Sequence, residues 1–189
     1  VEYGQPANVT CSIQKKTDAP YKLGWEAKLS QDYPENKTSA TWEVKELTDW
    51  EEPDGIRCYF TGKRLEDQCE THLNLTVYKK PDSVNLRSSS EVCVEGKQIE
   101  LRCEVVNVGP GRILSVRWSR ADPKQNNFTI FNESSVPELK NETKNVSITV
   151  NVPITPTRED DGAQYQCEAL LNLNQPLVFK SEKPITISV

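Results

Sequence analysis

The stretch DGAQYQC, residues 161–167, ends in a cysteine that follows a tyrosine by two residues. Upstream of it, Cys103 is followed fifteen residues later by Trp118. Two cysteines with a tryptophan between them are typical of a β-sandwich in which a disulfide joins the sheets and the tryptophan packs against it. The tyrosine hydroxyl then bonds back to the backbone. We therefore expect a Cys103–Cys167 disulfide, with Trp118 and Tyr165 in these two roles.

The rest of the sequence is typical of an all-β fold. Segments rich in valine, isoleucine, threonine and tryptophan alternate with clusters of proline, glycine, asparagine and aspartate. None of them sustains the 3.6-residue apolar period of a helix. Their spacing is that of immunoglobulin-like sandwiches. The expected strands include residues 7–13, 22–29, 38–47, 55–60, 72–80, 99–106, 114–120, 145–154 and 163–171.

The first half of the chain repeats the cysteine pattern in a reduced form. Cys11 precedes Trp25 by fourteen residues, and Cys58 follows within DGIRCYF. Ile56 stands where the second half has its corner tyrosine, so that hydrogen bond is not expected here. Because only forty-seven residues separate the cysteines, few strands fit between them. We expect a Cys11–Cys58 disulfide and a compact first domain.

The boundary between the repeats is expected at the proline of TVYKKPDSV, residues 76–84. This gives two tandem immunoglobulin-like β-sandwich domains, residues 1–80 and 81–189. Cys69 and Cys93 remain without a partner in this scheme. In an extended tandem they lie too far apart for a disulfide, which needs Cα atoms within about 7 Å. Cys69 could pair with a cysteine on a strand preceding this sequence, and Cys93 is either free or bonded outside it.

Cysteine usage and sequons place the chain outside the cytosol. The six cysteines include no C-x-x-C pair, which excludes zinc-ribbon and thioredoxin-like motifs. The net charge of −5 argues against nucleic acid or an anionic membrane as partner. We expect an extracellular, cell-surface glycoprotein whose single membrane-spanning segment would lie outside this chain. N-glycosylation is expected at Asn8, Asn36, Asn74, Asn127, Asn132, Asn141 and Asn145.

The residues show no pattern typical of an enzyme or a metal site. His72 is the single histidine and lies on an expected strand, with no nucleophile arranged beside it. Zinc sites usually need several histidine or cysteine ligands. The acidic runs TDWEEPDG and REDDG lack the ligand spacing of a calcium loop. We expect a binding module with no catalytic residue, metal or cofactor of its own.

The segment KLGWEAKL, residues 22–29, combines a strand pattern with a carboxylate that must face solvent. If Trp25 and the apolar residues alternating with it face the core, Glu26 points outward. On these grounds alone, Glu26 is either an ordinary solvated charge or a contact for a partner.

The chain resembles the two N-terminal domains of the intercellular adhesion molecule family over nearly its whole length. In the first domain the likeness rests on VTCS (9–12), LGWEAKL (23–29), CYF (58–60) and LTVYKKPDSVNL (75–86). In the second it rests on IELRCEV (99–105), RILSVRW (112–118), DDGAQYQCEALLNL (160–173) and the closing KPITISV. The resemblance implies that the first domain presents Glu26 to the inserted domain of a leukocyte integrin. There the carboxylate would complete the coordination of a Mg²⁺ that the integrin supplies, an ion that prefers oxygen ligands.

The resemblance also implies neighbours for Glu26. If Cys58 points inward, Arg57 and Tyr59 share the face of Glu26, and Tyr59 is expected to act as an aromatic anchor. Arg57 either contacts the partner or pairs with a neighbouring glutamate. Further contacts are expected at Thr61, Gln31 and Lys28.

The chain departs from the family pattern at two places. The family's first domains usually carry a second pair of cysteines, and Lys15 and Gly62 stand at those positions here. In HLNLTVY, residues 72–78, the leucines and valine are expected to point inward, so Asn74 points outward from the same sheet as Glu26. A glycan on Asn74 would therefore share its face.

These inferences predict an adhesion ligand for a leukocyte integrin, with the second domain as a glycosylated spacer. Two alternatives remain open. An immunoglobulin-superfamily receptor module would bind a soluble ligand at the interdomain elbow, near residues 78–82, independently of divalent cations. Homophilic adhesion through the first domain would instead appear as self-association.

Overall fold

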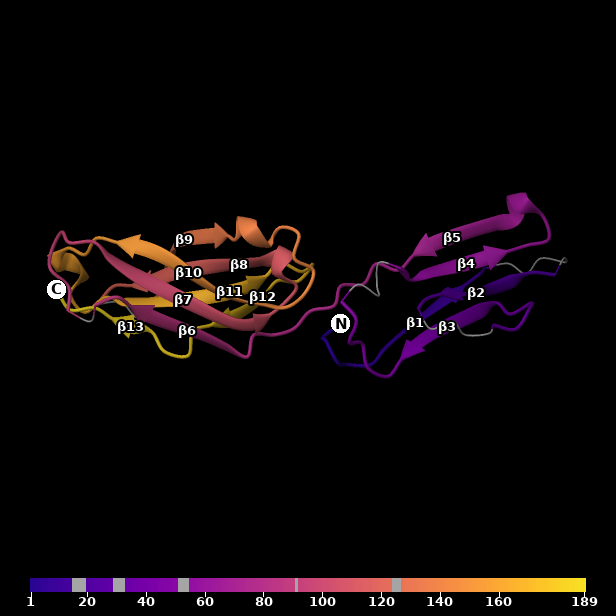
Figure 1. The fold of residues 1–189 in the computed structure, drawn as a ribbon, viewed down its shortest axis with the longest axis horizontal. Helices are drawn as coiled ribbons and strands as arrows, with labels where there is room; N and C mark the ends of the chain where they lie inside the picture. The colour runs from indigo at the N-terminus through magenta and orange to yellow at the C-terminus, as the bar shows by residue number, and fades with distance from the viewer. Residues whose placement is uncertain (15–19, 29–32, 51–54, 91, 124–126) are drawn as a thin grey trace. The chain divides into compact units, whose positions relative to one another are not determined.

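The computed structural model describes residues 1–14, 20–28, 33–50, 55–90, 92–123 and 127–189. They form two compact units, Val1–Tyr78 and Lys79–Val189, built from antiparallel β-sheets and short 3-10 helices (Figure 1). The predicted all-β class is confirmed. In the described ranges, no helix is long and apolar enough to cross a membrane.

Unit 1, Val1–Tyr78, contains two small sheets. In the first, β1 (Ala7–Ser12) pairs with β3 (Ser39–Val44). In the second, β4 (Arg57–Thr61) lies between β2 (Lys22–Glu26) and β5 (Gln68–His72). The 3-10 helix η1 (Leu65–Asp67) joins β4 to β5. All these pairs are antiparallel.

The core of unit 1 follows from alternation along these strands. Trp25 and Trp42 are buried between the sheets, and the Trp25 Nε1 donates to the carbonyl of Ala40 at 2.9 Å. The predicted disulfide joins Cys11 to Cys58. It therefore links β1 of one sheet to β4 of the other.

The last strand of unit 1 differs from the prediction of a strand over residues 72–80. The backbone N–H of Gly62 donates to the carbonyl of Asp67 at 3.1 Å, and this turn sets the register of the β4–β5 hairpin. His72 is opposite Arg57, the first residue of β4, and beyond it the Leu73 N–H still donates to the Ile56 carbonyl at 2.9 Å. Residues 76–78 instead exchange backbone hydrogen bonds with residues 1–3.

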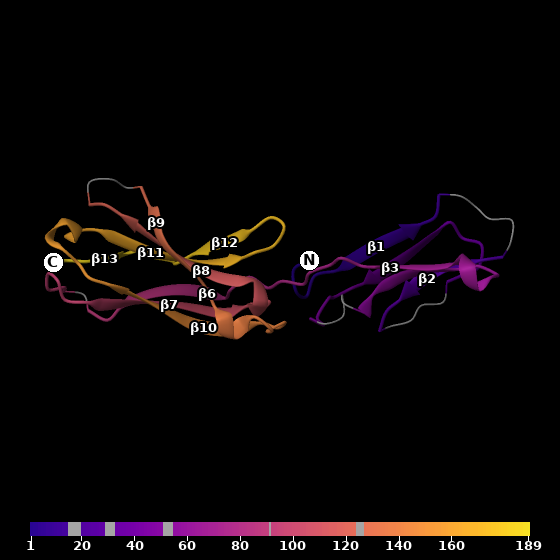
Figure 2. The ribbon, with the colours of Figure 1, turned by 90° about the horizontal axis from the view of Figure 1, so that it is seen from above.

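Unit 2 is a sandwich of two larger sheets, whose layers Figure 2 shows from above. One sheet contains β6 (Ser83–Ser88), β7 (Ile99–Val108) and β10 (Val146–Ile154). The other contains β8 (Leu114–Ala121), β9 (Thr129–Ser135), β11 (Gln164–Leu171), β12 (Leu177–Lys180) and β13 (Ile185–Thr186). The 3-10 helices are η2 (Gly111–Ile113), η3 (Pro137–Leu139) and η4 (Arg158–Asp160).

The core of unit 2 has the predicted disulfide, Cys103–Cys167. Trp118 is fully buried and lies opposite Cys167 on the neighbouring strand, and its Nε1 has no hydrogen-bond partner among the described residues. Tyr165 is buried at its predicted position. Its hydroxyl, however, faces the Arg120 guanidinium, because Arg120 lies opposite it on β8.

The two remaining cysteines form no disulfide in the structure. Cys69 is exposed on β5, and Cys93 is buried in unit 2. Burial raises the pKa of the Cys93 thiol. A partner for Cys69 on a preceding strand stays a prediction.

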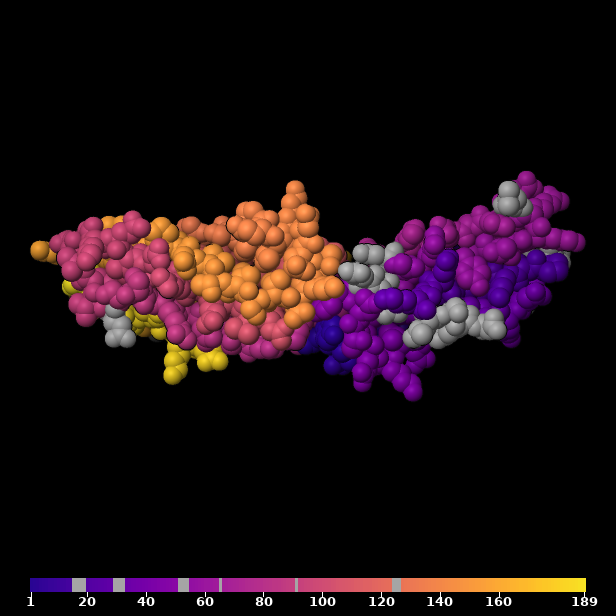
Figure 3. Space-filling model, in the orientation of Figure 1, coloured from indigo at the N-terminus to yellow at the C-terminus, as the bar shows by residue number. Residues whose placement is uncertain are grey.

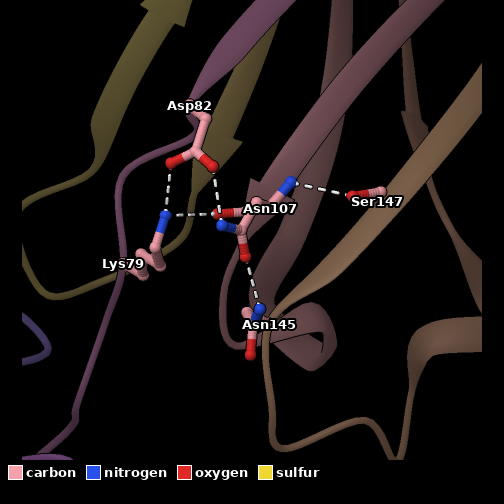
Figure 4. Close-up of polar contacts among 5 residues, drawn as sticks. All are labelled: Lys79, Asp82, Asn107, Asn145 and Ser147. Atoms are coloured by element: carbon pink, nitrogen blue, oxygen red, sulfur yellow. Dashed lines mark hydrogen bonds and ion pairs between the residues drawn. The ribbon is translucent and has the colours of Figure 1, made fainter.

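Five polar residues at the beginning of unit 2 form a network that we call the clamp: Lys79, Asp82, Asn107, Asn145 and Ser147 (Figure 4). The Lys79 ammonium donates to Asp82 Oδ1 at 2.5 Å and to the Asn107 carbonyl at 3.1 Å. Asn107 Nδ2 donates to Asp82 Oδ2 at 2.6 Å. Asn145 Nδ2 donates to Asn107 Oδ1, and Asn107 N–H donates to Ser147 Oγ at 3.0 Å. The clamp thus ties the first residues of unit 2 to β7 and β10.

The clamp predicts a pH dependence of the stability of unit 2. Hydrogen bonds from Lys79 and Asn107 lower the pKa of Asp82. Because the folded pKa is the lower one, this stabilisation is present above the ordinary aspartate pKa and is lost as pH falls through the folded pKa. Chemical denaturation at pH values from about 5 down to 2 measures this loss. As pH falls, the difference in free energy of unfolding between wild type and Asp82→Asn should shrink. The exposed Glu138→Gln on η3 is the control, and a pH-independent difference would contradict the prediction.

Candidate functional site

The outward side of β2, β4 and β5, which we call the outer face, carries the residues that the sequence singles out. Strand register arranges its side chains in three rows across the sheet. Because the pairing is antiparallel, residues in one row are direct neighbours. The side chains of β4 and β5, drawn in magenta, reach the surface of unit 1 (Figure 3). The rows are Glu26–Arg57–His72, Gly24–Tyr59–Glu70 and Lys22–Thr61–Gln68.

Glu26 is the last residue of β2, and 60% of its side chain is exposed. Its Oε2 forms an ion pair with Arg57 Nε at 3.0 Å. Arg57 Nη1 lies 3.3 Å from both carboxylate oxygens of Glu70. The expected pairing of Arg57 with a neighbouring glutamate is therefore present, and the guanidinium lies between two carboxylates.

Tyr59 lies across Gly24, its neighbour in the middle row. A Cβ atom on Gly24 would come within 2.7 Å of the Tyr59 hydroxyl oxygen and within 2.6 Å of the Tyr33 ring. Burial, and secondarily Tyr59, raises the pKa of Tyr33. Glycine at this position leaves room for the end of the Tyr59 ring over β2, next to the row that contains Glu26.

This contact predicts the effect of Gly24→Ala. The new methyl group should displace the Tyr33 and Tyr59 rings and lower the stability of unit 1 by about 1–3 kcal/mol, the usual range for overpacking. Chemical denaturation measures the stability, and NMR measures the ring shifts of both tyrosines. Gly55→Ala is the matched control, since a Cβ there meets nothing within 4 Å. Equal effects of the two substitutions would contradict the contact.

A hollow of about 530 Å³ opens on the outer face beside Glu26. It extends over β4 and β5 toward the end of the sheet opposite Glu26. Its lining is formed by Glu26, Tyr59, Phe60, Thr61, Gln68, Cys69 and Glu70. Among the described residues, no group of three or more histidine, cysteine, aspartate or glutamate side chains could hold a metal ion.

The structure brings four of the predicted contact residues together on the outer face: Glu26, Arg57, Tyr59 and Thr61. Lys28 lies two residues beyond the end of β2 and forms an ion pair with Asp49. Its contact with a partner on this face stays a prediction. Gln31 and Lys15 lie outside the described residues.

Glu70 and Gly24 are site residues that sequence reasoning missed. Glu70 lies opposite Tyr59 only because the turn over residues 62–67 fixes the hairpin register. A strand expected over residues 72–80 left Glu70 in the turn. Gly24 could have been found in the sequence. It is the one outward-facing position of KLGWEAKL that has no side chain, which indicates that another group lies over it.

The sequon asparagines are exposed except Asn132, which is half-buried on β9. Asn74 is exposed two residues beyond His72, while Leu73, Leu75 and Val77 pack against the core as expected. Because His72 lies in the row of Glu26, Asn74 lies beyond that end of β5, and it does not line the hollow. Glycosylation at these positions stays a prediction.

Comparison with known proteins identifies relatives. No family model matches the sequence. The chain is 28% identical over 180 residues to intercellular adhesion molecule 1 of Macaca mulatta, a match that covers 94% of this chain and 30% of that protein. It also matches the structure of an ICAM-5 D1–D4 ectodomain fragment with a TM-score of 0.63 and 19% identity, over 100% of this chain and 48% of that one. The chain is a relative of the intercellular adhesion molecules.

Further structures share the fold of this intercellular adhesion molecule relative. The structure of Rst D1–D2 matches with a TM-score of 0.55 and 15% identity, over 100% of this chain and 93% of that one. Together with the ICAM-5 fragment, it supports two tandem immunoglobulin-like domains, as predicted. The chain spans 30% of the length of the curated relative that it matches.

Proposed function

We propose that this chain belongs to a cell-surface adhesion glycoprotein and that unit 1 binds a leukocyte integrin through the outer face. In this proposal Glu26 completes the coordination of a Mg²⁺ held by the integrin's inserted domain. The observation that carries the proposal is the position of Glu26. It is a carboxylate 60% exposed at the end of a paired strand, beside a hollow, in a relative of the intercellular adhesion molecules.

The chemistry of the partner's ion suits such a carboxylate. Mg²⁺ takes oxygen ligands in near-octahedral geometry and commonly keeps waters that another ligand can replace. Because Glu26 lies on a strand paired with β4, little backbone freedom is lost when it binds. The metal is the partner's in this mechanism, so the chain needs no ion site of its own.

Tyr59 supplies the apolar part of the proposed contact. Its ring lies against Gly24, one row from Glu26. Aromatic side chains held in place in this way are common anchors of protein interfaces. Thr61 and Gln68, at the far end of the hollow, are proposed as polar contacts around it. Unit 2 is proposed as a spacer that carries four of the seven sequons.

The proposal is tested by binding of the glycosylated chain to immobilised integrin inserted domains locked in the open state. Binding is expected with Mg²⁺, is expected to disappear with EDTA, and should return when Mg²⁺ is restored. Binding that ignores EDTA would contradict the metal contact and favour a site of another kind. An Asn74→Gln variant, which lacks this glycosylation site, is measured in the same experiment. If it alone binds, the Asn74 glycan covers the outer face.

A further inference from the structure

Arg57 is the only described cation that forms an ion pair on the outer face, and two carboxylates share it. It uses different nitrogens for the two. Nε faces Glu26 on β2 at 3.0 Å, and Nη1 faces Glu70 on β5 at 3.3 Å. A guanidinium carries five N–H donors in a planar fork, so one of these contacts can break while the other stays. Arg57 is 36% exposed, which leaves its side chain room to move.

The charge of Arg57 conflicts with the metal contact. In the free chain its guanidinium partly neutralises Glu26. Once a Glu26 oxygen binds a divalent ion, the same guanidinium is a cation directly beside another cation, and the two repel. The repulsion weakens binding unless Arg57 moves away or its charge is balanced from the other side.

Glu70 is placed to balance it. It lies on β5, on the side of β4 opposite to Glu26, so the strands that carry the two carboxylates are separated by two strand spacings of about 4.8 Å each. Both of its oxygens already lie within reach of Arg57 Nη1. Rotation of the guanidinium toward Glu70 keeps Arg57 paired and carries its charge away from the metal.

We propose that, when Glu26 binds the integrin's metal, the Arg57 guanidinium leaves Glu26 and pairs with Glu70 alone. We call this change of ion-pair partner the carboxylate exchange. The inference rests on the proposed function and deepens it. Glu70 is a positioning residue, because it acts on the metal contact only through Arg57.

The test is a double-mutant cycle in the full chain, with Glu70→Gln, Arg57→Gln and both together. Two quantities are measured against a Mg²⁺-loaded open inserted domain: the Kd and the Mg²⁺ concentration that gives half-maximal binding. Glu70→Gln should raise both by about 5- to 10-fold, a coupling typical of residues in one charge network. Arg57→Gln should bind at least as tightly as wild type. Adding Glu70→Gln to it should cost no more than about twofold.

Glu66→Gln is the matched control. Glu66 is also an exposed carboxylate of unit 1 paired with an arginine, Arg64, at 3.2 Å, but it does not line the hollow. Glu66→Gln should leave the Kd and the Mg²⁺ requirement unchanged. This result separates the exchange from a general loss of negative charge. Unchanged circular dichroism and unfolding midpoints for every variant exclude a change of fold as the cause.

Two results would overturn the exchange while leaving the proposed function intact. One is Glu70→Gln binding like wild type with the same Mg²⁺ requirement. The other is that Glu70→Gln weakens binding by the same factor in the wild type and in the Arg57→Gln variant. That result would show that Glu70 attracts the partner directly. If wild type itself fails to bind, or binds in EDTA, the proposed function fails, and the exchange fails with it. The wild-type arm identifies that case.

Discussion

Replacing Glu26 with glutamine is expected to weaken Mg²⁺-dependent binding to the integrin inserted domain by at least about 30-fold. Glutamine keeps the shape of the side chain but removes the charge that would bind the ion. Losing one partner of a desolvated charge contact costs about 2–5 kcal/mol, and about 1.4 kcal/mol corresponds to a factor of ten. Surface plasmon resonance with wild type and variant measures the loss.

The fold should not change in this variant. The ion pair between Glu26 and Arg57 is solvent-exposed, and such pairs contribute only about 0–1 kcal/mol to stability. Glu43→Gln is the matched control, because Glu43 is an exposed strand carboxylate on the other sheet of unit 1. If Glu26→Gln bound as tightly as Glu43→Gln, Glu26 would be an ordinary solvated charge.

Replacing Trp118 with alanine is expected to unfold unit 2 or leave it marginally folded. Trp118 is fully buried beside the Cys103–Cys167 disulfide. Truncating a buried tryptophan costs about 3–5 kcal/mol, a large part of the roughly 5–15 kcal/mol that stabilises a typical domain. Chemical denaturation followed by far-UV circular dichroism measures the loss as a lower midpoint for one of the two units.

Phenylalanine substitutions supply the control for this prediction. Trp118 Nε1 has no hydrogen-bond partner among the described residues, so Trp118→Phe loses packing alone. Trp25→Phe also removes the hydrogen bond to the Ala40 carbonyl, and the loss of one such bond adds about 0.5–1.5 kcal/mol. Trp118→Phe should therefore cost less than Trp25→Phe, and much less than Trp118→Ala. Equal midpoints for Trp118→Ala and wild type would contradict the assigned core.

The fold could largely be predicted from the sequence because buried strands carry their own signal. Alternation around Trp25 and Trp118, together with the cysteine spacing, indicates which residues lie between the sheets. The strands β9 and β12 lacked this signal. They are edge strands with exposed apolar residues such as Phe131 and Val178, so their apolar and polar residues do not alternate in the sequence. The turn after β4 also set a register for β5 that composition does not reveal.

The same distinction applies to the candidate site. The exposure of Glu26 follows from alternation along its own strand. The positions of Arg57 and Tyr59 follow from the inward-pointing Cys58 between them. The neighbours across the sheet depend on register, a tertiary property, so Glu70 did not emerge from the sequence. The strand expected over residues 22–29 ends at Glu26 for a related reason, because local alternation does not show where pairing with the next strand stops.

Whether a Glu26 oxygen binds the partner's metal is tested most directly by paramagnetic NMR. The isotopically labelled chain would be titrated with an open inserted domain whose Mg²⁺ has been replaced by Mn²⁺, with the Mg²⁺ form as the diamagnetic reference. Paramagnetic broadening should be strongest at the Glu26 side chain and should decline outward along the rows, through Arg57 and Tyr59. Broadening centred elsewhere, or binding without selective broadening at Glu26, would contradict the proposed metal contact.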